Sequence, residues 1–168
     1  MICFISAALT TDGFIGKDSA HAAFWTSKED KKRFIEITKR AGVVVMGLNT
    51  YRTLGKPLKD RLNIVYSPEK LTGADAVAGV ETTTKAPSDL LADLAGRGFT
   101  EVAICGGSQI YTMFMESGVV NKLYITVEPI VFGSGIKLFN KSLDFRLTLE
   151  KSVTTESGSL LLEYKVNK

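Results

Sequence analysis

One acidic residue, Asp30, stands on the apolar face of the helix that we predict for residues 27–41. Phe34 and Ile37 follow Asp30 at positions i+4 and i+7, so the three side chains share one side of the helix. A carboxylate that faces a pocket beside Trp25 and Phe34 can accept two charge-assisted hydrogen bonds from the amidine-like edge of a ligand. The spacing therefore predicts a ligand-binding acid at Asp30.

Two capping patterns compete at the start of this helix. With Thr26 as the N-cap, Glu29 stands three residues further on and completes a capping box, so the cap is made without Asp30. With Ser27 as the N-cap, Asp30 is the third helical residue, where an acid complements the helix dipole. We expect the first pattern, which leaves Asp30 for a ligand.

Two glycine-containing junctions follow short apolar strands. Gly106-Gly107 follows the run 100–105, and Gly47 ends the run that begins at residue 42. Such glycines let the backbone approach a ligand, and the N–H groups of the next helical turn can hold a phosphate, but Gly-Gly at a strand end is equally typical of a tight turn. Because open α/β sheets bind ligands beyond their strand ends, two junctions at one edge favour an elongated cofactor.

The remaining polar candidates have ordinary alternatives. Arg61 follows a turn-like segment, where an arginine is usually a solvated charge, whereas a functional one would hold an anionic ligand in bidentate geometry. His21, the one histidine, lies in the long loop before the helix, and we expect it to be exposed and without a catalytic role. Cys3 and Cys105 both lie in apolar runs, so we expect free thiols in a reducing cytosol and no metal site.

The pattern of apolar residues places these candidates on a mixed α/β fold. Strands alternate with helices early in the chain, and the last two strands flank a Ser-Gly-Ser turn as an antiparallel pair. No Pro-, Gly- or Ser-rich linker divides the chain, so we expect one domain over residues 1–168. The predicted strands are 2–9, 42–46, 62–66, 100–105, 122–128, 147–153 and 160–166, and the predicted helices are 27–41, 87–95 and 107–118.

Composition excludes several classes of protein. The 168 residues carry 21 basic and 18 acidic side chains, and this net charge of +3 is too small and too dispersed to favour nucleic acid, although it suits a polyanionic small ligand. No apolar run approaches the ~20 residues that span a bilayer. The apolar start of the chain has no preceding basic region, so it predicts a buried strand and a cytoplasmic protein without a membrane partner.

In their order and spacing, these residues resemble the dihydrofolate reductase family over essentially the whole chain. The likeness is greatest to a divergent bacterial branch related to thermophile enzymes. The motifs that carry it are Ala7-Ala8-Leu9 with Ile15-Gly16, Trp25-x4-Asp30-x3-Phe34, Val45-Met46-Gly47-x2-Thr50-Tyr51, Leu54-Gly55-Lys56-Pro57-Leu58-x2-Arg61-x-Asn63-Ile64, Ile104-Cys105-Gly106-Gly107-x2-Ile110-Tyr111, Leu123-Tyr124-Ile125-Thr126 and Val131-Phe132-Gly133-Ser134-Gly135.

The resemblance implies a fold, a reaction and a set of ligands. The fold is a mixed, mostly parallel eight-stranded sheet flanked by about four helices. The reaction is the NADPH-dependent reduction of 7,8-dihydrofolate to 5,6,7,8-tetrahydrofolate, with hydride transfer to C6 and with protonation at N5 promoted by Asp30. Dihydrofolate would be the substrate, and trimethoprim or methotrexate would be inhibitors. The assembly would be a monomer or a homodimer.

The resemblance also carries roles over to individual residues. Asp30, Trp25 and Thr126 are the implied catalytic residues, and Arg61 would pair with the α-carboxylate of the glutamate tail. The implied substrate-binding residues are Ala8, Asp30, Lys31, Phe34, Leu54, Leu58, Arg61 and Thr126. The implied cofactor-binding residues are Ala7, Ile15, Gly16, Gly47, Leu48, Thr50, Ser67, Cys105, Gly106, Gly107, Gln109, Ile110 and Tyr111.

Three positions depart from the pattern of the family. Leu48 stands where the family usually has an arginine that binds the 2′-phosphate of NADPH, and Lys70 or Arg52 are the candidates to replace it. Lys31 stands where an apolar residue is more common. The loop from Lys17 to Phe24 differs from the usual closing loop.

Two other functions compete with this interpretation. The pyrimidine reductases of riboflavin biosynthesis share the fold and the glycine junctions, but they lack the combination of Asp30 and Arg61. A nucleotide-binding module without catalysis would have little reason to keep an acid on an apolar helix face. The sequence therefore favours dihydrofolate reduction.

Overall fold

The computed structural model describes residues 1–21, 25–72, 75 and 77–167, which form ten strands and four α-helices. The first half contains β1 (Ile2–Thr10), β2 (Phe14–Gly16), α1 (Lys28–Ala41), β3 (Val43–Gly47), α2 (Leu48–Leu54), β4 (Leu62–Tyr66) and β5 (Val80–Thr83). The second half contains α3 (Pro87–Gly96), β6 (Glu101–Ile104), α4 (Ser108–Glu116), β7 (Lys122–Glu128), β8 (Ile136–Lys137), β9 (Leu147–Thr154) and β10 (Leu160–Val166).

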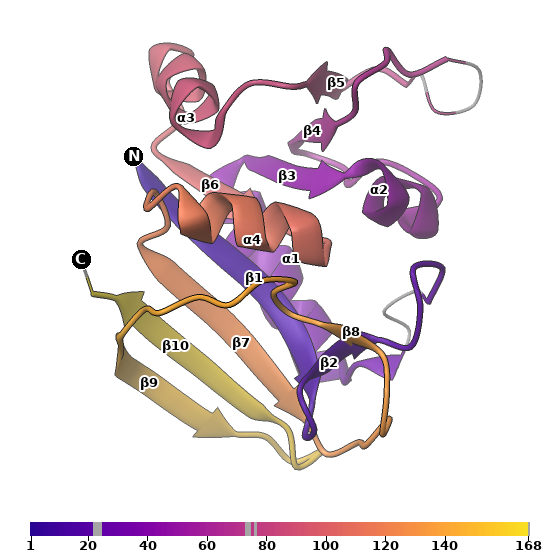
Figure 1. Ribbon diagram of the computed structural model, residues 1–168, viewed down its shortest axis with the longest axis vertical. Helices are drawn as coiled ribbons and strands as arrows, with labels where there is room; N and C mark the ends of the chain where they lie inside the picture. The colour runs from indigo at the N-terminus through magenta and orange to yellow at the C-terminus, as the bar shows by residue number, and fades with distance from the viewer. Residues whose placement is uncertain (22–24, 73–74, 76, 168) are drawn as a thin grey trace.

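Eight strands form one sheet in the order β5-β4-β3-β6-β1-β7-β10-β9, and β2 pairs with β8 in a small second sheet. Neighbours from β5 to β7 run parallel, and β10 runs antiparallel to both β7 and β9. The expected mixed, mostly parallel sheet with an antiparallel pair at its end is confirmed (Figure 1). Because the parallel strands share a direction, their carboxyl ends meet at one edge.

Apolar side chains cover both faces of the sheet, as is usual for parallel strands. On one face, Ile5 of β1 packs in a core with Leu94 of α3 and Phe114 of α4. On the other face, Phe4 of β1 packs in a second core with Ile37 of α1. In Figure 1, α4 accordingly crosses the front of the sheet and α1 lies behind it. The near-continuous apolar runs of the sequence follow from this burial on two sides.

The N-cap of α1 is Ser27, so the expected cap at Thr26 is wrong. The Ser27 hydroxyl accepts a hydrogen bond from the Asp30 N–H at 3.2 Å. The backbone N–H and the hydroxyl of Ser27 both donate to Oε1 of the buried Glu128, each at 2.8 Å. Glu128 lies at the end of β7, and Ser159 donates to its second oxygen. A distant acceptor therefore selects the cap, which local sequence does not reveal.

Three short strands fall outside the sequence prediction. β2, β5 and β8 contain three, four and two residues, so they are too short for an apolar period to show. The pairing of β2 with β8 joins the loop after β1 to the segment after β7.

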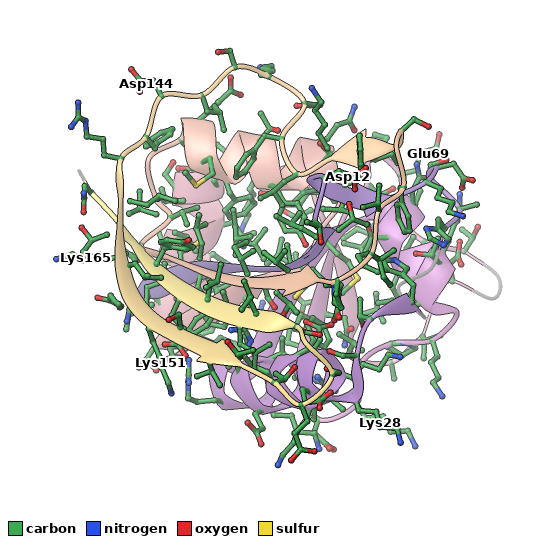
Figure 2. All side chains as sticks on the ribbon, turned by 90° about the horizontal axis from the view of Figure 1, so that it is seen from below. Asp12, Lys28, Glu69, Asp144, Lys151 and Lys165 are labelled. Atoms are coloured by element: carbon green, nitrogen blue, oxygen red, sulfur yellow. The ribbon has the colours of Figure 1, made fainter. Side chains whose placement is uncertain are left out.

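Most of the exposed side chains are polar or charged, whereas the carboxylate of Glu128 is buried. Lys28, Lys151 and Lys165 are exposed, and all three project from the periphery in Figure 2. Cys3 and Cys105 are free thiols. Within the part of the chain that the structure describes, every helix is too short or too polar to cross a bilayer.

Candidate active site

A cavity of about 1340 Å³ lies at the edge where β3 and β6 end. Ala7 and Ala8 of β1 contribute to its floor, and α1, α2 and α4 contribute to its walls. Pockets for one small ligand usually measure about 300–1000 Å³. This cavity is therefore large enough for two ligands side by side.

Nearly all the residues that the sequence assigned to ligands line this cavity. On the substrate side these are Ala8, Trp25, Asp30, Lys31, Phe34, Leu54 and Leu58. On the cofactor side they are Ala7, Ile15, Gly16, Gly47, Leu48, Thr50, Ser67, Cys105, Gly106, Gly107, Gln109, Ile110 and Tyr111. Thr126 and Arg61 are not among the lining residues.

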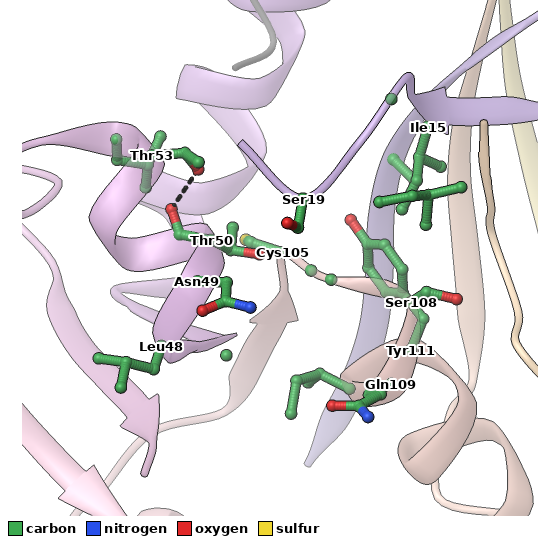
Figure 3. Close-up of a pocket in the computed structure, with 18 of the residues that line it drawn as sticks. Ile15, Ser19, Leu48, Asn49, Thr50, Thr53, Cys105, Ser108, Gln109 and Tyr111 are labelled. Atoms are coloured by element: carbon green, nitrogen blue, oxygen red, sulfur yellow. Dashed lines mark hydrogen bonds between the residues drawn. The ribbon is translucent and has the colours of Figure 1, made fainter. Parts of the chain in front are cut away.

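Two helices face each other across the cofactor side of the cavity (Figure 3). Thr50 and Thr53 of α2 lie on one side, and the Thr53 hydroxyl donates to the Thr50 carbonyl at 2.8 Å. Gln109 and Tyr111 of α4 lie on the other side, and Cys105 at the end of β6 lies between the helices. In open α/β sheets, ligands typically bind beyond the carboxyl ends of the strands, which is where these two strand–helix junctions lie.

Asp30 is held in place from two directions. Its backbone N–H is bound to the Ser27 cap, and its Oδ1 accepts a hydrogen bond from the Thr126 hydroxyl at 2.5 Å. Thr126 is fully buried in β7, so it acts by holding Asp30 and does not itself border the cavity. The side chain of Asp30 is partly buried at the cavity wall. A carboxylate fixed in this way can receive the N–H groups of a flat heterocycle.

Trp25 and His21 belong to an aromatic group at the mouth of the cavity. The His21 ring stacks on Trp25 at 6.5 Å between centroids, and Phe132 packs edge-on against both rings. The expectation that His21 is exposed is wrong, because this ring is partly buried and lines the cavity. The Trp25 Nε1 is buried and has no hydrogen-bond partner among the described residues. An unsatisfied donor at a cavity wall is suited to a ligand or an ordered water.

The two glycine junctions are joined to each other. The Gly47 N–H donates to the Gly106 carbonyl at 2.8 Å, and the Gly106–Gly107 peptide is cis. A Cβ at Gly107 would lie 3.3 Å from the Thr50 Oγ1, and one at Gly106 would lie 3.3 Å from the Tyr111 hydroxyl. Side chains at these positions would crowd the groove, so glycine keeps the backbone open to a cofactor.

The start of α4 fits the phosphates of a dinucleotide. Its N-cap is Gly107, which has no side chain. The N–H groups of the first turn therefore receive no hydrogen bond from a capping side chain. The buried Oγ of Ser108 has no hydrogen-bond partner among the described residues. N–H groups at a helix N-terminus, together with the helix dipole, favour an anion.

Two further ionisable groups of the cavity are neutral at physiological pH. Burial raises the pKa of the Cys105 thiol to about 12. Burial also raises the pKa of Tyr111 well above its ordinary value, and the Tyr111 hydroxyl donates to the Ser6 carbonyl at 2.8 Å. Neither group can therefore act as an anionic nucleophile. In the described ranges, no group of three or more potential metal ligands is found.

Arg61 is held by two hydrogen bonds and is not among the residues that line the cavity. Its Nη1 donates to the Thr38 hydroxyl at 2.7 Å, and its Nε donates to the Lys59 carbonyl at 2.8 Å. These bonds fix the orientation of the guanidinium, whereas Leu58, three residues earlier in the chain, does line the cavity. Burial lowers the pKa of Arg61, but a guanidinium remains charged at neutral pH.

The end of the cavity near Ser67 is rich in hydroxyl groups. Thr83 and Thr84, which the sequence interpretation missed, line it at the end of β5. Arg52 is engaged elsewhere, because its Nε lies 3.0 Å from the Asp75 carboxylate. The signal that could have identified the threonines is their position directly after a strand, but β5 was itself too short to predict.

Comparison with known proteins gives relatives of two kinds. The family described as dihydrofolate reductase matches residues 1–148. A dihydrofolate reductase type 3 from Salmonella typhimurium is 32% identical over 126 residues, which are 75% of this chain and 71% of the relative.

The second kind consists of solved structures that share the fold and are described as riboflavin biosynthesis or pyrimidine reductase-like proteins. A provisionally assigned riboflavin biosynthesis protein from Shewanella sp. PV-4 has a TM-score of 0.82 at 21% identity and covers 100% of both chains. A pyrimidine reductase-like protein from Corynebacterium diphtheriae has a TM-score of 0.75 at 18% identity over 99% of this chain and 92% of its own. Likeness at these identities shows the shared fold alone.

Proposed function

The chain belongs to the dihydrofolate reductase family and is an oxidoreductase of that fold, and we propose that it reduces 7,8-dihydrofolate to 5,6,7,8-tetrahydrofolate with NADPH. The observation that carries this proposal is the Asp30 carboxylate at the cavity wall, held by Thr126 and by the Ser27 cap. The cavity also has room for a second ligand beside the one that Asp30 binds.

The substrate side binds a flat, partly polar ring. Asp30 accepts hydrogen bonds from N3 and the 2-amino group of the pterin, since a carboxylate matches that pair of donors. Ala8, Phe34 and Leu58 line the adjoining wall, so they exclude water from the ring. Asp30 also favours protonation at N5, because a negative charge next to the bound pterin stabilises its protonated form.

The cofactor side binds NADPH along the groove between α2 and α4. The N–H groups at the start of α4 hold the pyrophosphate, and Ala7, Ile15 and Gly16 surround the nicotinamide. When bound, NADPH supplies the hydride that reduces C6. The protein contributes the alignment of the two rings and the dry surroundings.

Reduction of a ribosylated pyrimidine is the second candidate function. The observation that favours it is the position of Arg61 outside the cavity lining, and the solved structures named above show that proteins described as pyrimidine reductase-like share this fold. Asp30 favours folate instead, because it presents an acceptor to the amino-substituted edge of a pterin. A nucleotide-binding module without catalysis is less well supported, since a binder has no need of the held carboxylate.

The purified protein distinguishes these functions by the absorbance of reduced nicotinamide. Dihydrofolate or the pyrimidine precursor of riboflavin is offered together with NADPH or NADH. We expect rapid oxidation of NADPH with dihydrofolate. Turnover with the pyrimidine alone would reject the folate proposal, and no turnover with either substrate would favour the binding module.

The same proposal extends to location and ligands. The two free thiols, Cys3 and Cys105, suit a cytoplasmic protein. Trimethoprim and methotrexate carry diamino-substituted rings that match Asp30, so we propose both as inhibitors. We propose that the protein acts as a monomer or a homodimer. We also propose that it binds neither nucleic acid nor a membrane, and that it needs no metal.

A further inference from the structure

Arg33 is a cation that the folate chemistry above does not use. It lies on α1, one turn after Asp30, and its side chain is partly buried. The Nη2 donates to the Thr126 hydroxyl at 3.0 Å, and the Nη1 donates to the Leu162 carbonyl of β10 at 3.3 Å. The guanidinium carbon lies 6.0 Å from the centre of the Tyr124 ring. Arg33 is thus held by the Thr126 hydroxyl on β7 and by the Leu162 carbonyl on the neighbouring strand β10.

The hydrogen bonds through Thr126 have a fixed direction. A guanidinium group can only donate hydrogen bonds, so the Thr126 oxygen must accept from Arg33. Thr126 has a single hydroxyl hydrogen, and the Asp30 Oδ1 at 2.5 Å is the acceptor in line to receive it. Arg33 therefore donates to Thr126, Thr126 donates to Asp30, and neither hydrogen bond can be reversed.

We propose that Arg33 is a positioning residue that directs the Thr126 hydroxyl onto Oδ1 of Asp30 and thereby reserves Oδ2 for the ligand. Oδ1 can then only accept, so a proton on the carboxyl group resides on Oδ2. Among the described side chains, none donates to Oδ2. The consequence for turnover rests on the proposed function, but the effect on the carboxyl group does not.

The charged and titratable neighbours support a permanent positive charge at Arg33. Burial lowers the pKa of Arg33, while Asp30, Glu163 and Tyr124 oppose that effect. Glu163 of β10 is paired in register with Tyr124 of β7. Tyr111 of α4 is a neutral hydroxyl near Asp30, and Lys31, next to Asp30 on α1, is exposed and lines the cavity. Arg33 is therefore a partly buried cation that shares the Thr126 hydroxyl with Asp30.

Carboxyl ¹³C NMR of aspartate-labelled protein tests the proposal without any substrate. The signal of Asp30 is assigned by its loss in Asp30→Asn, and its titration is followed in wild type, Arg33→Met and Arg40→Met. Arg40 is a matched control, because it lies two turns further along α1 and also contacts Tyr124 but bonds to Glu101 and not to Thr126. Arg33→Gln, which removes the charge but keeps an N–H donor, serves if the methionine variant does not fold.

We expect the Asp30 signal of Arg33→Met to titrate about one pH unit higher than in wild type, and that of Arg33→Gln to move the same way by a smaller amount. Arg40→Met should titrate like wild type. Identical titrations in wild type and in the folded Arg33 variants would overturn the proposal, and so would an equal shift in Arg40→Met. If the protein turns over neither substrate, the proposed function fails while this titration still decides the role of Arg33.

Discussion

Among individual side chains, the pocket depends on a carboxylate whose position is set by its neighbours. The Ser27 hydroxyl binds the backbone of Asp30, and the Thr126 hydroxyl binds its Oδ1. Glu128 in turn accepts both polar hydrogens of Ser27. Since a hydrogen bond fixes direction as well as distance, these contacts aim the carboxylate more narrowly than burial alone.

Thr126→Val tests whether the hydroxyl matters for catalysis. Valine has nearly the same shape but cannot donate, so Oδ1 loses a hydrogen bond whose removal costs about 1.4 kcal/mol. We expect kcat/KM for dihydrofolate to fall about tenfold. Thr126→Ser keeps the hydroxyl and should stay within about threefold of wild type. Equal losses in the two variants would show that packing at this position matters and the hydroxyl does not.

Gly107→Ala tests the cofactor groove. The backbone at Gly107 has an ordinary φ of −83°, so alanine is tolerated there, but its Cβ would lie 3.3 Å from the Thr50 Oγ1 and would narrow the groove. We expect KM for NADPH to rise about tenfold or more with a smaller change in kcat. Gly96→Ala is the control, because a Cβ there meets nothing within 4 Å. An unchanged KM in Gly107→Ala would place the cofactor elsewhere.

Among helices and strands, the pairing of β2 with β8 shapes the mouth of the cavity. Ile15 and Gly16 of β2 and Ile136 of β8 all line it. Asp12 connects the same region, because its carboxylate accepts hydrogen bonds from the Thr10 hydroxyl and the Gly133 N–H, both at 2.6 Å. The loop after β7 is therefore attached to the turn after β1.

Gly135→Ala tests this β2–β8 contact. Gly135 has a φ of 153°, and a Cβ there would lie 2.3 Å from the Gly16 carbonyl oxygen, so the backbone must move. Gly133→Ala provides the control, since its φ of 75° is also unfavourable but its Cβ would meet nothing within 4 Å. We expect Gly133→Ala to lower the free energy of unfolding by about 1 kcal/mol, and Gly135→Ala by about 3 kcal/mol. Equal losses in urea denaturation would mean that the close approach to Gly16 is unimportant.

Asp12→Asn tests the attachment of the loop through its pH dependence. Hydrogen bonds from the Thr10 hydroxyl, and further ones from Gly133 and Phe132, lower the pKa of Asp12 below its usual value. Because the pKa is lower in the folded state, the stabilisation is present above the unfolded value of about 3.9 and is lost as the pH falls through the folded value. Wild type should therefore be more stable than Asp12→Asn at neutral pH, and the difference should shrink below about pH 4. A difference that is constant from neutral to acid pH would show that the charge of Asp12 is irrelevant.

Across the whole molecule, long apolar patterns were predictable from sequence and contacts between distant residues were not. The buried strands and α1 could be predicted because each has enough residues to show a period. The Ser27 cap could not, because Glu128, a hundred residues away, selects it. The place of His21 in the cavity depends on packing against Phe132, which lies far along the chain.

The residues of the candidate site also fall into those that the sequence could identify and those that only the structure reveals. The glycines and apolar residues next to strand ends that were assigned to ligands do line the cavity, and their contact with a ligand stays a prediction. Arg33 was missed, because an arginine on a helix usually points to solvent, and only the structure brings it to Thr126. Arg61 was assigned to the substrate, but it is not among the residues that line the cavity, and its bonds to Thr38 and Lys59 could not be predicted.

The most direct test of the account compares Asp30→Asn with wild type across pH, with dihydrofolate and NADPH. Asparagine keeps the size of the side chain but cannot carry the negative charge that favours protonation at N5. We predict that kcat falls about 100-fold or more, most severely at high pH where free protons are scarce, while circular dichroism shows an intact fold. A folded Asp30→Asn protein that retains the wild-type kcat over the whole pH range would contradict the central claim.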